Sequence, residues 1–168
     1  MSTASGSSFK LGAQETAFLR TIFLSIIAAS RGPDNVPCMA RALGCRLSSD
    51  LQQVTLLFSS SDAHEMLDHI AGNGAIAAVF SVPSTHESLQ LKGVDARVEK
   101  AAASDAALAA CHREAFVDQV GKLGHPRDLV RLLMTCESDD LVAVTFTPSA
   151  AFSQTPGPRA GCAIGTTR

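Results

Sequence analysis

Residues 53–82 read QVTLLFSSSDAHEMLDHIAGNGAIAAVFSV and carry the clearest local pattern in the chain. The β-favouring and apolar residues of Gln53–Phe58 indicate a buried strand. The serines and the aspartate at 59–62 follow it, and their short oxygen-bearing side chains predict a helix N-cap. Apolar residues at three- and four-residue spacings extend the helix to Ala71, where a glycine-rich turn ends it. The next strand is predicted over Ala75–Val82, so a short helix joins two strands.

The flanking sequence predicts more strands than helices. Strands are expected over Ile22–Ala29, Val36–Leu47, Ser88–Glu99 and Leu141–Pro148, and helices over Leu11–Arg20, Asp105–Lys122 and Pro126–Met134. Gly93 is expected to form a bulge in its strand. The six strands cluster with short turns instead of alternating with helices, which favours a mostly antiparallel sheet or barrel of the α+β class. A helical pair precedes the last strand.

The length of 168 residues predicts one domain. Residues 1–10 are small and polar, so we expect them to be disordered. Residues 11–148 are expected to form the domain, with a helical insertion at about 101–135. Residues 149–168 are expected to be an irregular tail.

The composition narrows the class of function. The chain is 46% hydrophobic and 18% charged with a net charge of −2, which excludes a disordered chain and disfavours nucleic acid as a partner. Tryptophan and tyrosine are absent, so a dimer contact is expected to be aliphatic. The five cysteines form no C-x-x-C pair, and no apolar run approaches the roughly 20 residues of a membrane span. We therefore expect a cytoplasmic protein with reduced thiols that acts on a small molecule, not at a membrane.

Two familiar motifs are matched only in part. Gly72–Ala77 fits G-x-G-x-x-A, but it leaves a helix and opens a strand, the reverse of a dinucleotide-binding turn. His64 and His69 resemble the zinc helix H-E-x-x-H, yet they are five residues apart and thus roughly 140° apart around a helix. No metal site is predicted from these patterns.

Basic and hydroxyl side chains suggest an anion site. Arg41 and Arg46 are five residues apart on a predicted strand and point to opposite faces unless Gly44 introduces a bulge. Each arginine is either a solvated charge or a guanidinium fork for a phosphate. The serines at 59–61 either cap the helix or add hydroxyl and N–H donors to that phosphate site.

Three segments in this order resemble the pyridoxamine 5′-phosphate oxidase-like flavin-binding split barrels. They are the P-x-x-x-R stretch Pro37–Arg41, the serine turn before the short helix, and the S-x-Q-x-x-G stretch Ser88–Gly93. The resemblance covers roughly Leu11–Glu99. It implies an antiparallel six-stranded split β-barrel and a homodimer with FMN at the interface.

The resemblance also implies a set of FMN-binding residues. The phosphate would lie near Arg41, Arg46, Ser59, Ser60 and Ser61, the flavin ring along Ala42, Leu43 and Gly44, and Gln90 would contribute from the strand that begins at Ser88.

The chain departs from the oxidase itself where the short helix begins. A basic pair holds the phosphate there in the oxidase, whereas Glu65 and Met66 stand at that place here, and no lysine or arginine occurs between Arg46 and Lys92. A carboxylate repels a phosphate dianion. The sequence thus predicts an FMN-dependent oxidoreductase on an unidentified small molecule, other than a true pyridoxamine 5′-phosphate oxidase.

Two other functions stay open. One is a non-catalytic split-barrel module that binds flavin, haem or another planar ligand, and an axial haem ligand would come from His64, His69, His86, His112 or His125. The other is a hydrolase or transferase whose site is assembled in space, with Cys38 or Cys45 as the nucleophile.

Overall fold

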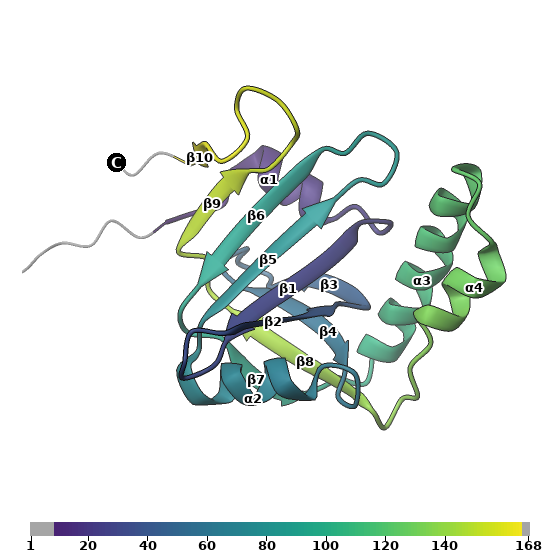
Figure 1. Ribbon diagram of the computed structural model, residues 1–168, viewed down its shortest axis with the longest axis horizontal. Coiled ribbons are helices and arrows are strands. Elements are labelled where there is room, and N and C mark those ends of the chain that lie inside the picture. Colours follow the sequence, from purple (N-terminus) through teal and green to yellow (C-terminus); the bar gives the residue numbers. More distant parts are fainter. Residues whose placement is uncertain (1–8, 166–168) are drawn as a thin grey trace, which may run out of the picture.

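The computed structural model describes residues 9–165. These residues form four helices and ten strands (Figure 1). The strands make two sheets in which all strand pairings are antiparallel. This confirms the predicted α+β class and the antiparallel split barrel, with a short helix in the middle of the chain and a helical pair before β8. The predicted disorder of residues 1–8 lies outside the described residues, while Phe9 packs against the core.

The two sheets, A and B, contain six and four strands. Sheet A has the order β10-β9-β6-β5-β1-β2, formed by β1 (Ser25–Arg31), β2 (Pro37–Arg41), β5 (Ile76–Ser81), β6 (Ser88–Gly93), β9 (Ala150–Ser153) and β10 (Ala163–Ile164). Sheet B has the order β3-β4-β8-β7, formed by β3 (Gly44–Leu47), β4 (Val54–Ser59), β8 (Leu141–Phe146) and β7 (Arg97–Lys100). The helices are α1 (Ala13–Leu19), α2 (His64–Asn73), α3 (Asp105–Lys122) and α4 (Arg127–Leu133).

Two of the six predicted strands are each divided between the sheets. Val36–Leu47 was expected as one strand, but the amide of Ala42 donates to the carbonyl of Ile26 in sheet A and the amide of Leu43 donates to Leu57 in sheet B, at 2.9 and 2.7 Å. The chain thus changes sheets between β2 and β3. Ser88–Glu99 is divided in the same way into β6 and β7. Alternating apolar residues cannot reveal such a corner, because the alternation continues through it.

Gly93 does not form the predicted bulge. It pairs with Ile76 in a regular antiparallel register at the end of β6. Its place in the fold has a packing reason instead, since a Cβ there would lie 2.7 Å from Cδ2 of the fully buried Phe146. The absence of a side chain lets the ring of Phe146 approach the backbone.

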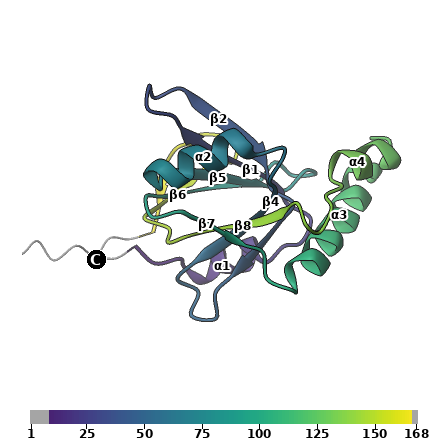
Figure 2. The same ribbon diagram turned by 90° about the horizontal axis from the view of Figure 1, so that it is seen from below.

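The core lies between the two sheets, and α2 covers one open side of it. The largest fully buried side chains are Phe58, Phe80, Phe146, Leu24, Ile26, Leu56, Leu57, Met66, Ile70, Leu91, Val54 and Val117. Figure 2 shows α2 between β2 of sheet A and β7 of sheet B, and both strands contact it. Its apolar stripe is therefore buried as the spacing predicted.

The helices α3 and α4 pack together at one end of the barrel, as Figure 1 shows in green. The predicted bounds of α3 agree with the structure, and α4 is one residue shorter at each end than predicted. A second apolar cluster joins this pair to the barrel through Leu43, Leu57, Phe116, Val120 and Met134. Among the described residues, no helix is both long enough and apolar enough to cross a membrane.

An ion pair fastens α3 to β3. Arg46 donates through Nε to Oδ1 of Asp105 at 2.9 Å and through Nη2 to Oδ2 at 3.3 Å, and the side chain of Asp105 is fully buried. The amide of Ala102 also donates to Asp105, at 2.8 Å. Burial raises the pKa of Asp105, but the hydrogen bonds and the charge of Arg46 together with the Ala102 amide outweigh it, so the pKa lies below its ordinary value. Asp105 is held as a carboxylate.

The segment predicted as an irregular tail contributes two strands. β9 pairs with β6 and buries Ala151, and β10 pairs with β9. The prediction was wrong for these residues, because strands of four and two residues are too short for an alternating pattern to show.

Substitution of Gly93 by alanine is expected to destabilise the fold. The added Cβ would meet Phe146, whose ring is enclosed on all sides, and such overpacking costs about 1–3 kcal/mol of unfolding free energy. Urea denaturation measures the change. Gly72→Ala is the matched control: a Cβ at this position of α2 would meet nothing within 4 Å, and alanine favours a helix by about 0.5–1 kcal/mol. An equal loss in both variants would contradict this account of Gly93.

Asp105→Asn is expected to lower the unfolding free energy by about 1.5–3 kcal/mol at pH 7, the range for hydrogen bonds to a charged group. Because the pKa of Asp105 is lowered in the folded chain, its stabilisation is present above the unfolded value of about 3.9 and is lost as the pH falls through the folded value. The gap between wild type and variant should therefore close in acid. Asp118→Asn, an exposed ion-pair partner on the same helix, is the control and should change stability little at any pH.

Candidate functional site

The outer face of sheet A brings two of the predicted site residues into one row. The register pairs Arg41 with Ile27, Ile27 with Val79, and Val79 with Gln90. Residues paired in this way point to the same face of a sheet, and three strand spacings separate Arg41 from Gln90 by roughly 14 Å. We call these four residues the outer row. Arg41 and Gln90 thus share one surface, although they are 49 positions apart in the sequence.

The outer row is half-buried or exposed, while its neighbours point into the core. Ile27, Val79 and Gln90 are half-buried and Arg41 is exposed, whereas adjacent positions such as Ala28 are fully buried. The face therefore offers an apolar floor between a cation at one end and an amide at the other.

Arg41 keeps its positive charge available. Its Nη1 donates to Oγ of Ser25 at 3.1 Å, and its Cζ lies 5.8 Å from the centre of the Phe116 ring. Burial lowers the pKa of Arg41 from its ordinary value, but a guanidinium stays protonated in proteins. Across residues 9–165, no carboxylate lies within ion-pair distance of it. An external anion would meet no competing acid bonded to this guanidinium.

A row of serines, which sequence reasoning missed, runs beside the outer row on the same face. Ser25 pairs with Ser81 and Ser81 with Ser88, and the hydroxyls of Ser81 and Ser88 lie 2.7 Å apart. Only the register between strands reveals this row, since Ser25 is distant in sequence from the hairpin that carries Ser81 and Ser88. Its hydroxyls extend the polar surface next to Arg41.

His112 lies behind Arg41 and Phe116. The residue is 3% exposed, and its ring is stacked parallel to Phe116 with centroids 6.5 Å apart. Burial lowers the pKa of His112 to about 4, with a bond to the Leu24 carbonyl acting against this and the charge of Arg41 adding to it. The ring is neutral at pH 7, and its Nε2 has no hydrogen-bond partner among the described residues.

The residues expected along the flavin ring are covered by the chain itself. Ala42, Leu43 and Gly44 are all buried, and a Cβ on Gly44 would lie 3.7 Å from Cα of Ala109 in α3. Leu43 packs in the apolar cluster with Phe116. The chain itself therefore covers these residues, Ala42 in the main core and Leu43 and Gly44 beside α3.

Arg46 does not join Arg41. The chain changes sheets between them, and Arg46 is occupied by Asp105 and by Oγ1 of Thr55, which accepts from Nη1 at 3.2 Å. The two arginines therefore belong to different sheets. The sequence had suggested one strand, with the arginines on opposite faces or brought together by a bulge at Gly44, and neither alternative is correct.

The serine turn already binds a carboxylate of this chain. Ser59 and Ser61 donate their hydroxyls to Oδ2 of Asp140 at 2.6 and 2.8 Å, and the Ser61 amide donates to Oδ1 at 3.0 Å. The amide of Ser60 donates to the Asp140 carbonyl. These bonds, that of Ser59 first, hold the pKa of Asp140 below its ordinary value. The donors near which the resemblance would place a phosphate hold an internal anion instead.

The predicted helix cap is wrong in detail. The helix α2 begins at His64, and its N-cap residue Ala63 makes no side-chain capping bond. Residues 59–62 form a separate turn before it, in which Oγ of Ser59 accepts from the amide of Asp62 at 3.2 Å. Asp140, which is distant in sequence, holds the hydroxyls of Ser59 and Ser61 in this turn, before the helix begins.

The two cysteines considered as nucleophiles are not activated thiolates. Burial raises the pKa of Cys45 to about 12, and burial together with the charge of Glu65 raises the pKa of Cys38. A reactive cysteine needs a lowered pKa. The raised pKa values of Cys38 and Cys45 therefore count against cysteine-based hydrolysis or transfer.

Comparisons with known proteins identify the fold. No family model matches the chain, and no curated protein matches it in sequence. Among solved structures, HupZ of Group A Streptococcus is 16% identical with a TM-score of 0.53, and the match covers 90% of this chain and 100% of HupZ. An F420 reductase is 14% identical with a TM-score of 0.52, over 84% of this chain and 98% of that one.

A third similar structure carries the family's name. It is a Clostridium acetobutylicum protein related to general stress protein 26 and described as of the pyridoxine-phosphate oxidase family. It is 16% identical with a TM-score of 0.51, and 92% of each chain is covered. Identities this low establish a shared fold and nothing finer. The chain thus has the split-barrel fold of the pyridoxamine 5′-phosphate oxidase-like proteins, the group that its sequence resembles.

Proposed function

We propose that this chain is a homodimeric flavin-binding protein, with FMN on the outer face of sheet A and its phosphate at Arg41. The observation that carries the proposal is the outer row, in which an arginine free of any bonded carboxylate and an amide share one surface. The split-barrel fold is shared with an F420 reductase and with a protein of the pyridoxine-phosphate oxidase family, which supports a flavin-type ligand.

The residues present fit such a ligand. The guanidinium of Arg41 and the hydroxyl of Ser25 are suited to a phosphate, because charge-assisted hydrogen bonds are the strongest that side chains make. Ile27 and Val79 give an apolar floor on which a flat ring can lie. The amide nitrogen of Gln90 can donate hydrogen bonds at the polar edge of that ring, while its oxygen accepts from Nε2 of Gln154 at 3.1 Å.

The proposal departs from the resemblance in three places. Asp105 occupies Arg46, and Asp140 occupies the serine turn of Ser59, Ser60 and Ser61. The helix α3 packs beside the stretch of Ala42, Leu43 and Gly44. The phosphate therefore rests on Arg41 and Ser25. Bound FMN supplies hydride-transfer chemistry, and protein groups position it and exclude water. The chain is then an oxidoreductase on a small molecule, other than a true pyridoxamine 5′-phosphate oxidase.

A second copy of the chain is the proposed cover of this face. Met39 lies on the same side of β2 as Arg41 and is 71% exposed, and Ala29, its partner in the register, is half-buried. An apolar sheet face that borders an edge strand is the kind of surface that a symmetric dimer buries. A cofactor bound there would be enclosed between two subunits.

The alternative is a non-catalytic module that binds flavin, haem or another planar ligand. The unpartnered Nε2 of the neutral His112 favours it, because such a nitrogen is able to ligate haem iron. The two functions separate in one assay: a bound flavin that NAD(P)H does not reduce, or a haem absorption band in place of flavin binding, identifies the module.

Arg41→Ala is expected to weaken FMN binding about 10- to 150-fold, since the loss of a hydrogen bond to a charged group costs about 1.5–3 kcal/mol. Quenching of flavin fluorescence on titration gives the affinity, and F420 in a parallel titration shows which flavin-type ligand binds. Arg97→Ala removes an exposed arginine of sheet B and serves as the control. Absence of any binding by the wild type, or equal affinity in wild type and Arg41→Ala, would refute the site.

Met39→Glu is expected to convert a dimer into a monomer, because it places a charge on the proposed dimer face. Size-exclusion chromatography with light scattering gives the mass at several concentrations. Val94→Glu is the matched control, since Val94 is 74% exposed but lies between β6 and β7, outside the strands of sheet A. A monomeric wild type, or the same dissociation in both variants, would rule out this interface.

A further inference from the structure

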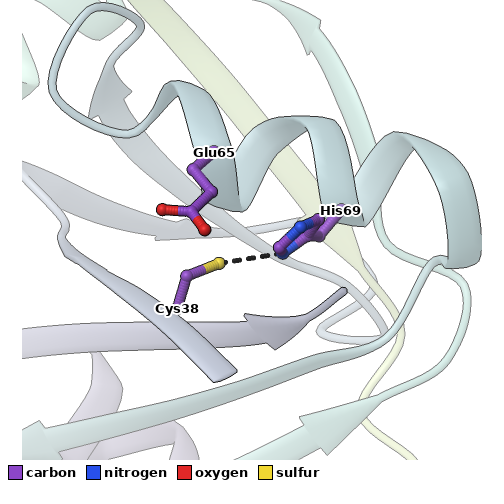
Figure 3. A group of neighbouring side chains, drawn as sticks. All are labelled: Cys38, Glu65 and His69. Atoms are coloured by element: carbon purple, nitrogen blue, oxygen red, sulfur yellow. Dashed lines mark hydrogen bonds between the residues drawn. The ribbon is translucent and has the colours of Figure 1, made fainter. Parts of the chain in front are cut away.

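Three metal-ligating side chains meet where β2 packs against α2. Figure 3 shows the thiol of Cys38 pointing from β2 toward the helix, where it meets the carboxylate of Glu65 and the ring of His69. Sγ of Cys38 lies 3.0 Å from Nδ1 of His69, and the ligand atoms of all three residues lie within 4.8 Å of one another. Glu65 and His69 are four residues apart on α2 and so share one helix face.

These separations are close to those around a single small ion. With Zn–S bonds of about 2.3 Å and Zn–N bonds of about 2.0–2.1 Å in a tetrahedron, neighbouring ligand atoms stand roughly 3.3–3.6 Å apart. Small side-chain rotations would bring the Cys38, Glu65 and His69 atoms to such spacings. The strand and the helix need not move apart.

The mixture of donors indicates the class of metal. One sulfur, one imidazole nitrogen and one carboxylate oxygen suit zinc and similar divalent transition ions, whereas magnesium and calcium prefer oxygen ligands alone. We propose that Cys38, Glu65 and His69 form a three-ligand site for a divalent ion of the zinc type.

Coordination would change one bond in the structure. The hydrogen bond between the Cys38 thiol and Nδ1 of His69 is replaced by bonds from both atoms to the ion, and the thiol proton passes to solvent. The positive ion also separates Glu65 from the sulfur, so two negative ligands can lie side by side. Three protein ligands leave a fourth position for water or a small ligand.

The orientation of His69 is set by the hairpin beneath it. A Cβ at Gly32 would lie 2.8 Å from Nε2 of His69, so only a glycine leaves room for the ring in this position. With Nε2 held against Gly32, Nδ1 faces the thiol. Glu65 is exposed and Cys38 and His69 are half-buried, so an ion can reach the three ligands from solvent.

The proposed metal site is separate from the proposed flavin site. Successive residues of a strand point to opposite faces, so Cys38 faces α2 while Met39 and Arg41 face the outer side of sheet A. The sequence predicted no metal site, because the histidine pair His64 and His69 cannot share an ion. In the structure His69 has a different partner, a cysteine 31 positions before it.

Cobalt(II) is the probe that tests the site, because a cobalt–thiolate bond produces a charge-transfer absorption in the near ultraviolet. We expect wild-type protein, stripped of metal with a chelator, to develop this band with one equivalent of Co²⁺ and to lose it when Zn²⁺ is added. Cys38→Ser should abolish the band. Glu65→Gln and His69→Gln should weaken Co²⁺ binding at least tenfold. Cys111→Ser and His64→Gln, at exposed positions, are the matched controls and should keep it.

The outcomes separate this proposal from others. No band in the wild type, a band that survives Cys38→Ser, or a band lost equally in the Cys111→Ser control would overturn the site. Thermal unfolding of each variant followed by circular dichroism checks that the chain still folds, and Zn²⁺ should raise the melting temperature of the wild type but not of folded Cys38→Ser. Arg41→Ala should bind Co²⁺ like the wild type whether or not the flavin proposal holds.

Discussion

Two consecutive amides hydrogen-bond to different sheets, and the architecture depends on this crossing. Ala42 donates to sheet A and Leu43 to sheet B, so the strand that begins at Pro37 cannot continue in one sheet. Because of the crossing, Arg41 is the last residue of β2 and lies on the outer face of sheet A. It also brings β3 under α3, where Arg46 and the buried Asp105 fasten the helix. The change of sheet at Ala42 and Leu43 therefore also places Arg41 and Arg46 in different sheets.

The chain neutralises most of the groups that a phosphate could have used. Asp105 binds Arg46, and Asp140 binds the hydroxyls and amides of the serine turn. A carboxylate tethered in the same chain acts at a high effective concentration, so it occupies such donors before a dissolved anion does. Arg41 differs because its neighbours are a hydroxyl and an aromatic ring, which leave its charge unmatched. This difference explains why the proposed phosphate site centres on one arginine.

The edge strand β2 presents two kinds of chemistry on its two faces. Met39 and Arg41 face outward, toward the proposed dimer contact and flavin, while Cys38 faces α2 with Glu65 and His69. The resemblance to the oxidase would put Glu65 in the place of part of the basic pair. A carboxylate at that place opposes a phosphate but suits a cation, so the departure from the oxidase pattern and the proposed metal site are two consequences of one residue.

Local sequence was enough to define the types of the elements, whereas folding defines which side chains meet. Periodicity and turn residues predicted the α+β class, the short helix between two strands and the helical pair, including the bounds of α3 at Asp105–Lys122. These features depend on residues a few positions apart, and a single sequence shows such spacings directly. The clustering of the strands predicted the antiparallel arrangement and the resemblance added the split barrel, and the structure confirms both.

The contacts of the candidate sites could not be predicted in this way. The row that joins Arg41 to Gln90 depends on three strand registers, and the partners of Arg46, Ser61 and His69 lie 59, 79 and 31 positions away. Neither strand register nor a change of sheet leaves a mark in the local pattern, because alternation looks the same on either side of a corner. The candidate sites of this protein are therefore products of long-range pairing, and the elements that carry them are products of local sequence.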